Sequence, residues 1–415
     1  MQKSLKYVFF NLLRLSLGLL FLFSGFVKCV DPVGGAIKIE DYFIAWGFSN
    51  VPEGFCLFLS VLQNIVEFTV GFALFVGVHV RLASLFALLF MLFYTPLTLY
   101  IALVNPVSDC GCFGDAVKLT NWQTFFKNLI FLPIAFLVFK WSKELKPSVK
   151  RWRQTALLAC GVTIGVLVSI KGLTDEPMID FRPFSVGTDV PQAMSVPSNA
   201  PLTEYATTFL LEKDGVIKEF DEKNYPYDDS TWVYRETRTV VVKEGYTPSI
   251  NDFTFIDRDG EDHSEELLHD PEPIFLAISP KLEKSDDCDL TRIANLSDMV
   301  RKNGYRFYVC TSSTEDVLLQ IQSEFPDSEL SFLLADETML KTIVRSNLSV
   351  IVMQRGVISA KYHINHLPDF NTFAAAPTSS YLQSVELSYD WLQMLCLVLV
   401  CIIVFMLVYK RKKNK

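Results

Sequence analysis

The sequence predicts a membrane α-helical bundle of about six transmembrane helices, followed by an α/β domain outside the membrane. Of the 415 residues, 50% are hydrophobic and 34 are Phe, a composition too apolar for an ordinary soluble protein. Six apolar runs also approach the ~20 residues needed to cross a bilayer, although the fifth is short. The runs cover residues 8–27, 55–78, 82–104, 122–141, 155–171 and 391–409.

The first apolar run follows Lys3 and Lys6, as in a signal peptide. However, the run is long and no small-x-small cleavage site follows it. Lys28 before Cys29 also does not fit a lipoprotein signal. We therefore expect an uncleaved first transmembrane helix.

Charge differs between the regions of the chain. Residues 174–388 carry a net charge of −19 and the remainder +11, which together give −8. The basic residues gather at one set of helix ends, which the positive-inside rule places in the cytoplasm. These residues are Lys3, Lys6, Arg14, Arg81, the segment 140–153 and Lys410 to Lys413. The expected location is a bacterial cytoplasmic (inner) membrane, with both termini cytoplasmic and residues 174–388 on the outer side.

The segment Asp109-Cys110-Gly111-Cys112-Phe113-Gly114-Asp115 lies between the third and fourth apolar runs. A disulfide closed across one residue is geometrically tight, so it should be strained and easily reduced. Gly111 and Gly114 permit the turns that such a closure needs. The pattern favours a redox dithiol over half of a metal site or a turn with two ordinary thiols.

Glu67 lies well inside the second apolar run, where a carboxylate is costly and often functional. The alternative is a neutral Glu67 or one bonded to a neighbouring helix. Thiol oxidation releases protons, so Glu67 and Asp109 or Asp115 are candidates to handle them. Lys28 would raise the thiolate fraction if it folds near the cysteines.

The first four runs form one module, residues 1–145, and residues 155–171 form a fifth transmembrane helix. The module resembles the DoxX/MauE-type membrane family in Ser24-Gly25-Phe26-Val27-Lys28, Asp31-Pro32, Glu67 and Cys110-Gly111-Cys112-Phe113-Gly114. The resemblance implies membrane redox work. MauE-like members are linked to disulfide formation in an exported partner, and DoxX members to quinone-coupled sulfur oxidation.

Residues 174–244 are expected to form a linker and a β-hairpin region. Short strands around a Lys-Asp-Gly turn predict one hairpin in residues 208–220, and a similar pattern in residues 254–260 predicts a second. From Pro273 the pattern becomes α/β. The expected strands are 274–278, 305–310, 330–335, 350–353 and 357–362, and the expected helices are 290–303, 315–324 and 337–345.

This order resembles a thioredoxin-like domain over residues 245–375. Ser279-Pro280-Lys281 stands where a thioredoxin would place Cys-x-x-Cys, and Cys288 is the only cysteine that follows closely. No helix start is evident to activate Cys288. Ser346-Asn347-Leu348-Ser349 replaces the expected cis-proline. The pattern therefore predicts a degenerate thioredoxin-like domain that binds a partner.

The other cysteines and histidines give weaker signals. Cys310 is expected in the core of the outer domain, and Cys160 in helix packing. His363-x-x-His366 is not convincingly helical, so a metal site is not expected. No nucleic-acid footprint is present.

The favoured hypothesis is a membrane thiol–disulfide oxidoreductase. Cys110 and Cys112 would pass electrons between an exported or periplasmic protein and a membrane acceptor such as a quinone, with membrane lipid around the bundle. One alternative is a non-enzymatic scaffold that binds a partner through its outer domain. Another is a membrane subunit of a sulfur-oxidising quinone reductase.

Overall fold

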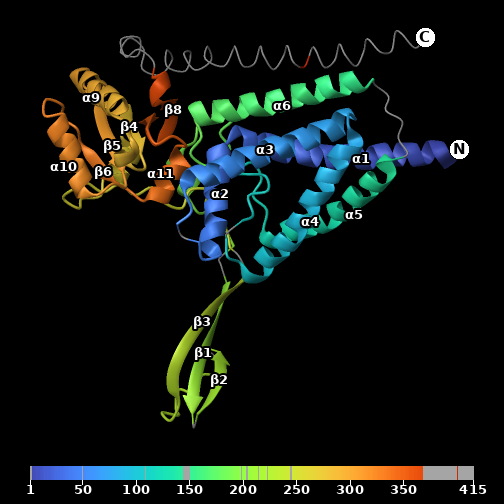
Figure 1. The fold of residues 1–415 in the computed structure, drawn as a ribbon. Coiled ribbons are helices and arrows are strands. Elements are labelled where there is room, and N and C mark those ends of the chain that lie inside the picture. Colours follow the sequence, from blue (N-terminus) through green and yellow to red (C-terminus); the bar gives the residue numbers. More distant parts are fainter. Residues whose placement is uncertain are drawn as a thin grey trace. The chain divides into compact units, whose positions relative to one another are not determined.

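The computed structural model describes residues 2–48, 50–107, 109–143, 150–197, 199–201, 204–213, 215–221, 223–243, 245–367 and 400. The chain divides into two compact units (Figure 1). One unit combines Met1–Gly187 with Thr254–Lys415 and contains the helical bundle and a five-stranded sheet. The other unit is Thr188–Phe253.

Five helices among the described residues are long and apolar enough to cross a membrane. They are α1 (Gln2–Val30), α3 (Glu53–Val76), α4 (Val80–Val104), α5 (Asn121–Ser142) and α6 (Arg151–Thr174). These helices confirm the first five apolar runs. The predicted sixth run, residues 391–409, lies outside the described residues apart from Val400.

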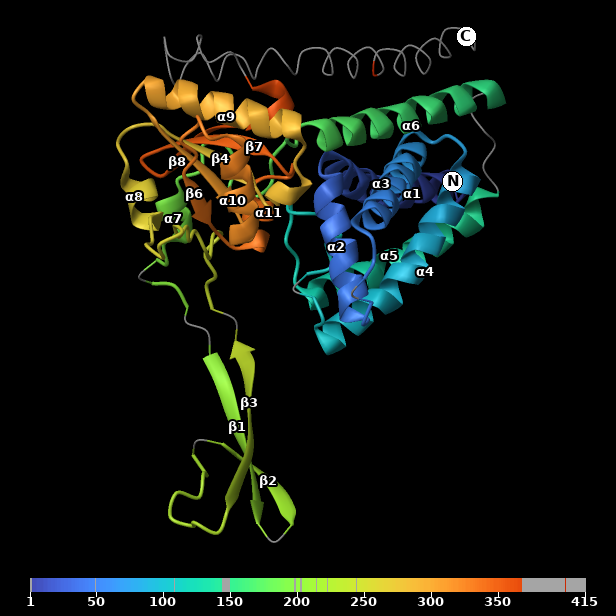
Figure 2. The same cartoon turned by 60° about the vertical axis from the view of Figure 1, so that its left-hand side comes forward.

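Close packing of α1 on α3 organises the bundle. A Cβ atom added to Gly25 would lie 2.3 Å from the backbone nitrogen of Phe68, and one added to Gly71 would lie 2.1 Å from that of Leu22. Small residues allow two transmembrane backbones to approach closely in this way. Helix α5 packs against α4, and α6 lies along α3 in both views (Figures 1 and 2).

A short helix, α2 (Pro32–Ala45), follows α1. Asp31 caps it by accepting a hydrogen bond from the Gly34 N–H at 2.8 Å. Pro32 occupies the first helical position, where its missing N–H costs nothing. Helix α2 packs on α3 and lies beside the cysteine loop.

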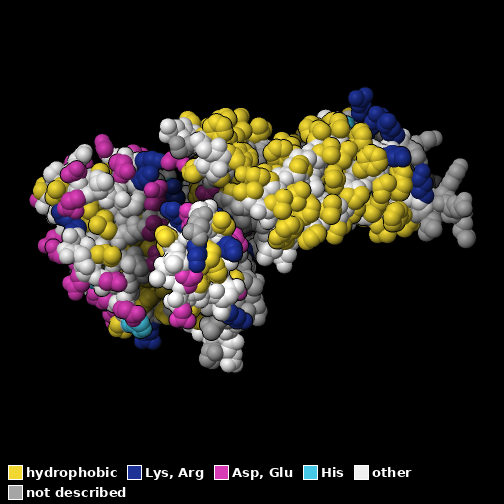
Figure 3. Space-filling view, turned by 90° about the horizontal axis from the view of Figure 1, so that it is seen from below, with side chains coloured by type: hydrophobic (Ala, Val, Ile, Leu, Met, Phe, Trp, Pro, Cys, Tyr) yellow, Lys and Arg dark blue, Asp and Glu magenta, His cyan; other side chains and the backbone are white. Residues whose placement is uncertain are grey.

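The outer surface of the bundle is apolar. Figure 3 shows a broad hydrophobic area over the helical part, with Lys and Arg side chains gathered at its far end. Large apolar side chains of α1, α4 and α5 are exposed on the bundle. They include Leu12, Leu89, Phe93, Phe126 and Ile130. A surface of this kind is stable in contact with lipid tails, so the chain is a multi-pass membrane protein.

The sheet has the order β6-β5-β4-β7-β8. Strand β5 pairs in parallel with β4 and with β6. Strand β7 pairs antiparallel with β4 and with β8. The strands are β4 (Ile274–Ser279), β5 (Arg306–Thr311), β6 (Phe332–Leu334), β7 (Ser349–Gln354) and β8 (Val357–His363). The helices and 3-10 turns of this part are α8 (Ser264–His269), η1 (Leu282–Lys284), α9 (Asp287–Lys302), α10 (Glu315–Glu324), α11 (Glu337–Ile343) and η2 (Ile364–His366).

These elements confirm the predicted alternation of strands and helices after Pro273. Alternate side chains of β4, β5 and β7 form one core with the apolar sides of α9 and α10. Cys310 is fully buried in β5, as expected for a core thiol, and burial raises its pKa.

The second unit contains α7 (Val190–Met194) and a three-stranded antiparallel sheet of order β2-β1-β3. Strands β1 (Glu204–Lys213) and β2 (Val216–Asp221) confirm the first predicted hairpin. The sequence prediction missed β3 (Val233–Lys243), because consecutive charged residues interrupt its apolar alternation.

The second predicted hairpin, residues 254–260, is wrong as a pair of strands. Ile256 forms only isolated bridges, one to Asp262 and one to Leu334 of β6. Two main-chain hydrogen bonds close the turn within this segment, from Asp257 N–H to the Glu261 carbonyl and from His263 N–H to the Phe255 carbonyl, and Ile256 also exchanges hydrogen bonds with Leu334 of β6.

Candidate functional site

The two thiols of the cysteine loop lie beside each other. The loop joins α4 to α5, and the Sγ atoms of Cys110 and Cys112 are 2.6 Å apart as free thiols. Gly111 and Gly114 have φ angles of 63° and 51°, in the left-handed region that favours glycine. The Asp109 carboxylate accepts a hydrogen bond of 2.8 Å from the Gly111 N–H and fixes this turn.

The two thiols differ in acidity. Hydrogen bonding from Cys110 lowers the pKa of Cys112 to about 6, and the Lys127 and Lys28 ammonium groups assist against the opposing effect of burial. The same hydrogen bond, together with burial, raises the pKa of Cys110. The arrangement therefore favours a Cys112 thiolate that accepts a hydrogen bond from the Cys110 S–H group.

A buried ion pair lies next to this loop. Lys28 Nζ of α1 is 2.9 Å from Glu67 Oε2 of α3, and both side chains are less than a tenth exposed. The Ser24 hydroxyl lies 2.5 Å from the other oxygen, Glu67 Oε1, and also reaches the main-chain carbonyl of Cys112. Asn64 donates to the Lys28 carbonyl at 2.9 Å. The close approach of α1 to α3 at Gly25 makes these contacts possible.

The two loop carboxylates are held by cations from different parts of the chain. Asp109 pairs with Lys38 of α2 at 3.0 Å. Asp115 pairs at 3.1 Å with Arg345, which follows α11 in the sheet part. Arg345 also pairs with Asp31, the cap of α2, at 2.8 Å. Arg345 therefore connects the sheet part to both the cysteine loop and α2.

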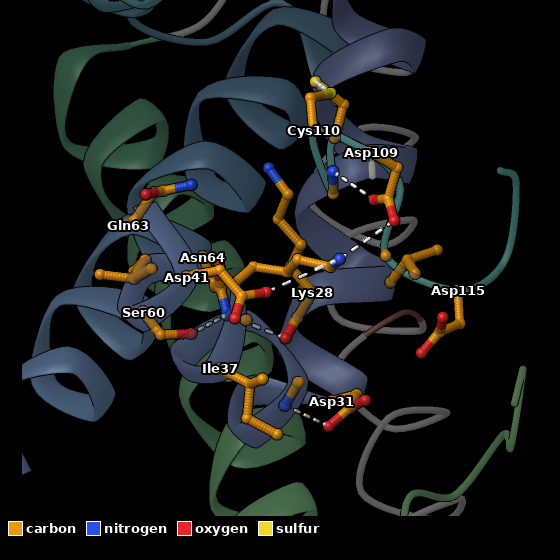
Figure 4. A pocket seen from close by; sticks show the side chains of 18 of the residues that line it. Lys28, Asp31, Ile37, Asp41, Ser60, Gln63, Asn64, Asp109, Cys110 and Asp115 are labelled. Atoms are coloured by element: carbon orange, nitrogen blue, oxygen red, sulfur yellow. Dashed lines mark hydrogen bonds and ion pairs between the residues drawn. The ribbon is translucent and has the colours of Figure 1, made fainter. Parts of the chain in front are cut away.

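A cavity of about 1040 Å³ adjoins the thiols. Figure 4 shows Lys28, Asp31, Asp109, Cys110 and Asp115 around it. The α11 region, with Lys341 and Arg345, and the segment 177–183 line another part of the cavity. The bundle and the sheet part thus enclose the space in front of the dithiol together.

One wall of this cavity is apolar and belongs to transmembrane helices. Phe90, Phe93 and Tyr94 of α4 and Leu62 of α3 line it. Phe93 is 60% exposed and Leu62 is 48% exposed, so both also lie at the lipid-facing surface. The cavity therefore extends from the charged loop to the apolar surface of the bundle.

The structure brings together all six residues singled out in the sequence, although Asp109 and Asp115 face different cations. They are Lys28, Glu67, Asp109, Cys110, Cys112 and Asp115.

Sequence reasoning gave no role to Lys127, Tyr42 or Arg345, and named Ser24 only as part of the segment that carries the family resemblance. Ser24 precedes Lys28 by four residues and therefore shares its helix face, which was a usable signal. Tyr42 donates to the Cys110 carbonyl at 3.1 Å, and Lys127 Nζ lies 4.3 Å from the centre of the Phe113 ring.

One expectation about Cys288 is wrong. Helix α9 begins at Asp287, three residues before the predicted start, so Cys288 lies in its first turn. The side chain of Asp286 caps this helix by accepting from the Asp289 N–H. An Asp at the cap and acidic residues in the first turn are signals of a helix start, which the sequence prediction overlooked.

Two groups of possible metal ligands occur among the described residues. Their ligand atoms lie within 4.8 Å of one another in each group, and the groups are Asp257 with Glu261 and His263, and Asp286 with Cys288 and Asp289. The ion pair between His263 and Asp257, at 3.1 Å, explains the first group without a metal. In the His363-x-x-His366 pattern, His366 pairs with the Asp175 carboxylate at 3.2 Å.

Fold and site together define a multi-pass membrane protein with a paired-thiol loop beside a buried ion pair. Residues 6–140 match the family described as "Methylamine utilisation protein MauE". This match covers the four-helix module and supports the MauE part of the predicted resemblance. Residues 205–244, in the second unit, match a domain of unknown function (DUF8463). No curated protein and no solved structure gave a match.

Proposed function

We propose that this chain is a membrane thiol–disulfide oxidoreductase whose Cys110–Cys112 pair passes electrons from an exported protein to a membrane acceptor. The observation that carries the proposal is the pair of adjacent free thiols, one favoured as a thiolate, at a cavity that reaches the lipid-facing surface. The match of residues 6–140 to MauE supports a role in a redox system.

The proposed exchange proceeds through a mixed disulfide. A thiolate of the exported partner attacks one sulfur of the oxidised pair, and the Cys110–Cys112 bond breaks as the mixed disulfide forms. The second partner thiolate then attacks that bond. The partner leaves as a disulfide, and the pair retains two electrons as a thiol and a thiolate. Transfer of these electrons to a two-electron membrane acceptor restores the Cys110–Cys112 disulfide.

A quinone is the proposed acceptor, because the apolar wall of the cavity fits an aromatic ring with a hydrocarbon tail. Phe90, Phe93 and Tyr94 of α4 and Leu62 of α3 would hold it. A quinone supplies a sink for two electrons and two protons. The chain itself contributes thiols at one end of the cavity and an apolar wall at the other.

Glu67 and Lys28 are proposed to manage charge during the exchange. Lys28 stabilises the Cys112 thiolate and the Glu67 carboxylate together, and Glu67 accepts a proton when thiols are oxidised. Asp109 and Asp115 remain candidates for proton transfer. Their ion pairs with Lys38 and Arg345 also give both residues a structural role.

The proposed location is a bacterial cytoplasmic membrane with the cysteine loop and residues 174–388 on the outer side. The positive charge at the opposite helix ends supports this orientation. The sheet part is proposed to be a degenerate thioredoxin-like domain that binds the exported partner. Its support is the order β6-β5-β4-β7-β8 with three parallel strands, and Ser279-Pro280-Lys281 after β4 in place of a cysteine pair.

Trapping of the mixed disulfide tests the function. Cys110→Ser and Cys112→Ser are each expressed in native membranes, free thiols are blocked with N-ethylmaleimide, and adducts are resolved without reductant. Both variants should lose partner oxidation, and one should accumulate a reductant-sensitive adduct with an exported protein. Cys160→Ser in α6 is the matched control and should behave as the wild type. If Cys288→Ser abolishes exchange while Cys110→Ser leaves it intact, the reactive thiol lies in the sheet part and the proposal is wrong.

A further inference from the structure

We infer that the Gln63 side chain of α3 and the Tyr94 hydroxyl of α4 bind the oxygen atoms of the membrane acceptor, a quinone. The inference rests on the proposed function and deepens it, because it names the polar contacts that orient the acceptor beside the thiols. Apolar contact holds a ring and a tail but does not fix which way a flat ring faces. A few polar groups among apolar side chains give a ligand site its orientation and specificity.

Gln63 and Tyr94 are polar side chains inside two membrane helices that follow each other in the chain. Gln63 lies 13 residues before the end of α3 at Val76, and Tyr94 lies 14 residues after the start of α4 at Val80. A short turn joins the two helices, so both side chains lie about 20 Å along their helices from that turn. Both line the cavity that adjoins the thiols, and Figure 4 shows Gln63 at this cavity together with Cys110.

These two side chains differ from the other polar groups on the same wall. Ser60, Asn64 and Thr98 also line the cavity, but each donates a hydrogen bond to a main-chain carbonyl. Neither the Gln63 amide nor the Tyr94 hydroxyl makes a hydrogen bond to any residue that the structure describes. A polar group that faces an apolar space within a membrane is unfavourable without a partner. A ligand with carbonyl oxygens satisfies both groups.

Both side chains can bind a quinone in its oxidised and in its reduced form. The carbonyl oxygens of a quinone only accept hydrogen bonds, and the Gln63 amide and the Tyr94 hydroxyl can donate them. A hydroquinone has hydroxyl groups that also donate, and the oxygen atoms of Gln63 and Tyr94 can accept from them. A lysine or an arginine would offer donors alone. The pair therefore suits an acceptor that enters oxidised and leaves reduced.

Tyr94 also connects this site to the thiols. It lines the large cavity and, in addition, a small space that it shares with Cys112, Glu67 and Lys28. Lys28 Nζ lies 5.8 Å from the centre of the Tyr94 ring. A quinone held by the Tyr94 hydroxyl therefore lies beside the group of residues that surrounds the Cys112 thiolate.

The site is open toward the membrane. Leu62 precedes Gln63 and is 48% exposed, and Phe93 precedes Tyr94 and is 60% exposed. Both exposed side chains line the same cavity, so a lipid-soluble molecule reaches the two polar groups without crossing the charged end. A lipid ester carbonyl offers the same acceptor chemistry, but it has no flat ring to pack against Phe90 and Phe93. For this reason the occupant is a quinone.

Photoaffinity labelling of the wild type tests the site. Purified full-length protein in lipid nanodiscs is illuminated with an azido derivative of a short-tailed benzoquinone, and labelled peptides are identified by mass spectrometry. Labelling should fall on α3 and α4 around Gln63 and Tyr94, and unlabelled decylubiquinone should compete with it. Nanodiscs hold lipid in large excess. Labelling that decylubiquinone does not displace, or that spreads over the lipid-facing surface, would show lipid at this site and overturn the inference.

Two conservative substitutions measure the polar contacts. Tyr94→Phe and Gln63→Leu remove the polar group and keep most of the side-chain volume. Each should weaken competition by decylubiquinone about two- to tenfold, as expected for the loss of one hydrogen bond. Tyr100→Phe is the matched control, because Tyr100 lies on the same helix, is 38% exposed and is not part of the described cavity lining. Wild-type affinity in either Tyr94→Phe or Gln63→Leu, or an equal loss in Tyr100→Phe, would overturn the inference.

Thiol exchange is measured separately from quinone binding. At a fixed pH the Cys110–Cys112 pair of both variants should reach the wild-type equilibrium with glutathione, because neither substitution removes a hydrogen bond to the cysteine loop. A changed equilibrium would show that the substitutions act on the loop and would overturn the assigned contacts. Failure to trap a mixed disulfide with an exported partner, with displaceable labelling intact, would contradict the proposed function and leave the quinone site in place.

Discussion

Removal of the Cys110 thiol should make Cys112 a weaker acid. The Cys110→Ala variant lacks the S–H group that donates to the Cys112 sulfur across 2.6 Å. That hydrogen bond is the largest cause of the lowered Cys112 pKa, and burial acts against it. Without the bond, burial opposes only Lys127 and Lys28, so the pKa of Cys112 should rise toward the ordinary thiol value.

The size of this effect follows from the two pKa values. With a pKa of about 6, Cys112 is roughly 90% thiolate at pH 7, whereas an ordinary thiol of pKa ~8.5 is only about 3% thiolate. The thiolate is the reacting species, and a more basic thiolate reacts somewhat faster, which offsets part of the loss. A Brønsted coefficient of ~0.4–0.5 over about 2.5 pKa units restores roughly tenfold or more of the ~30-fold loss in thiolate, so we expect an alkylation rate at pH 7 about two- to threefold lower in Cys110→Ala.

The assay is the rate of Cys112 alkylation by iodoacetamide against pH, measured by mass spectrometry on reduced protein in nanodiscs. The alkylation rate of the wild type should rise with pH around an inflection near pH 6. In the variant this inflection should lie at least one pH unit higher. Cys288, which is exposed on α9, is an internal control and should give the same profile in both proteins. An unchanged inflection in Cys110→Ala would refute the assigned hydrogen bond.

Two further substitutions test how the loop is held. Arg345→Ala leaves Asp31 and Asp115 without their shared cation, so we expect the protein to lose about 2–4 kcal/mol of stability. We also expect faster proteolysis between the sheet part and the bundle. Thermal unfolding and limited trypsin digestion in detergent measure the two effects. The exposed Arg355→Ala should change neither, and an equally stable Arg345→Ala would show that the ion pairs do not hold the two parts together. Gly111→Ala should cost about 1–2 kcal/mol, because a φ angle of 63° strains any side chain, and should lower the yield of the Cys110–Cys112 disulfide in glutathione buffers. A disulfide yield equal to that of the wild type would argue that the turn relaxes without penalty.

The sequence by itself determined the features whose signals are local. Apolar length located five membrane helices, and alternating strand and helix patterns located the elements of the sheet part. The cysteine pair and Glu67 were also visible, because a close pair of thiols and a carboxylate within an apolar run are unusual wherever they occur. Local patterns misled in residues 254–260, where Ile256 pairs with the edge of the sheet, in β3 and at the start of α9.

Tertiary structure decided which of these residues meet. Ser24 and Glu67 are 43 residues apart and touch because glycines let α1 and α3 approach closely. Arg345 reaches Asp115 across 230 residues, and no sequence period connects positions that far apart. Helix and strand periodicities assign a side chain to a face of its own element, but packing alone selects its neighbour across the bundle. For this reason the candidate dithiol and Lys28 were predictable, whereas the contacts that Ser24, Lys38 and Arg345 make with the loop were decided by tertiary packing.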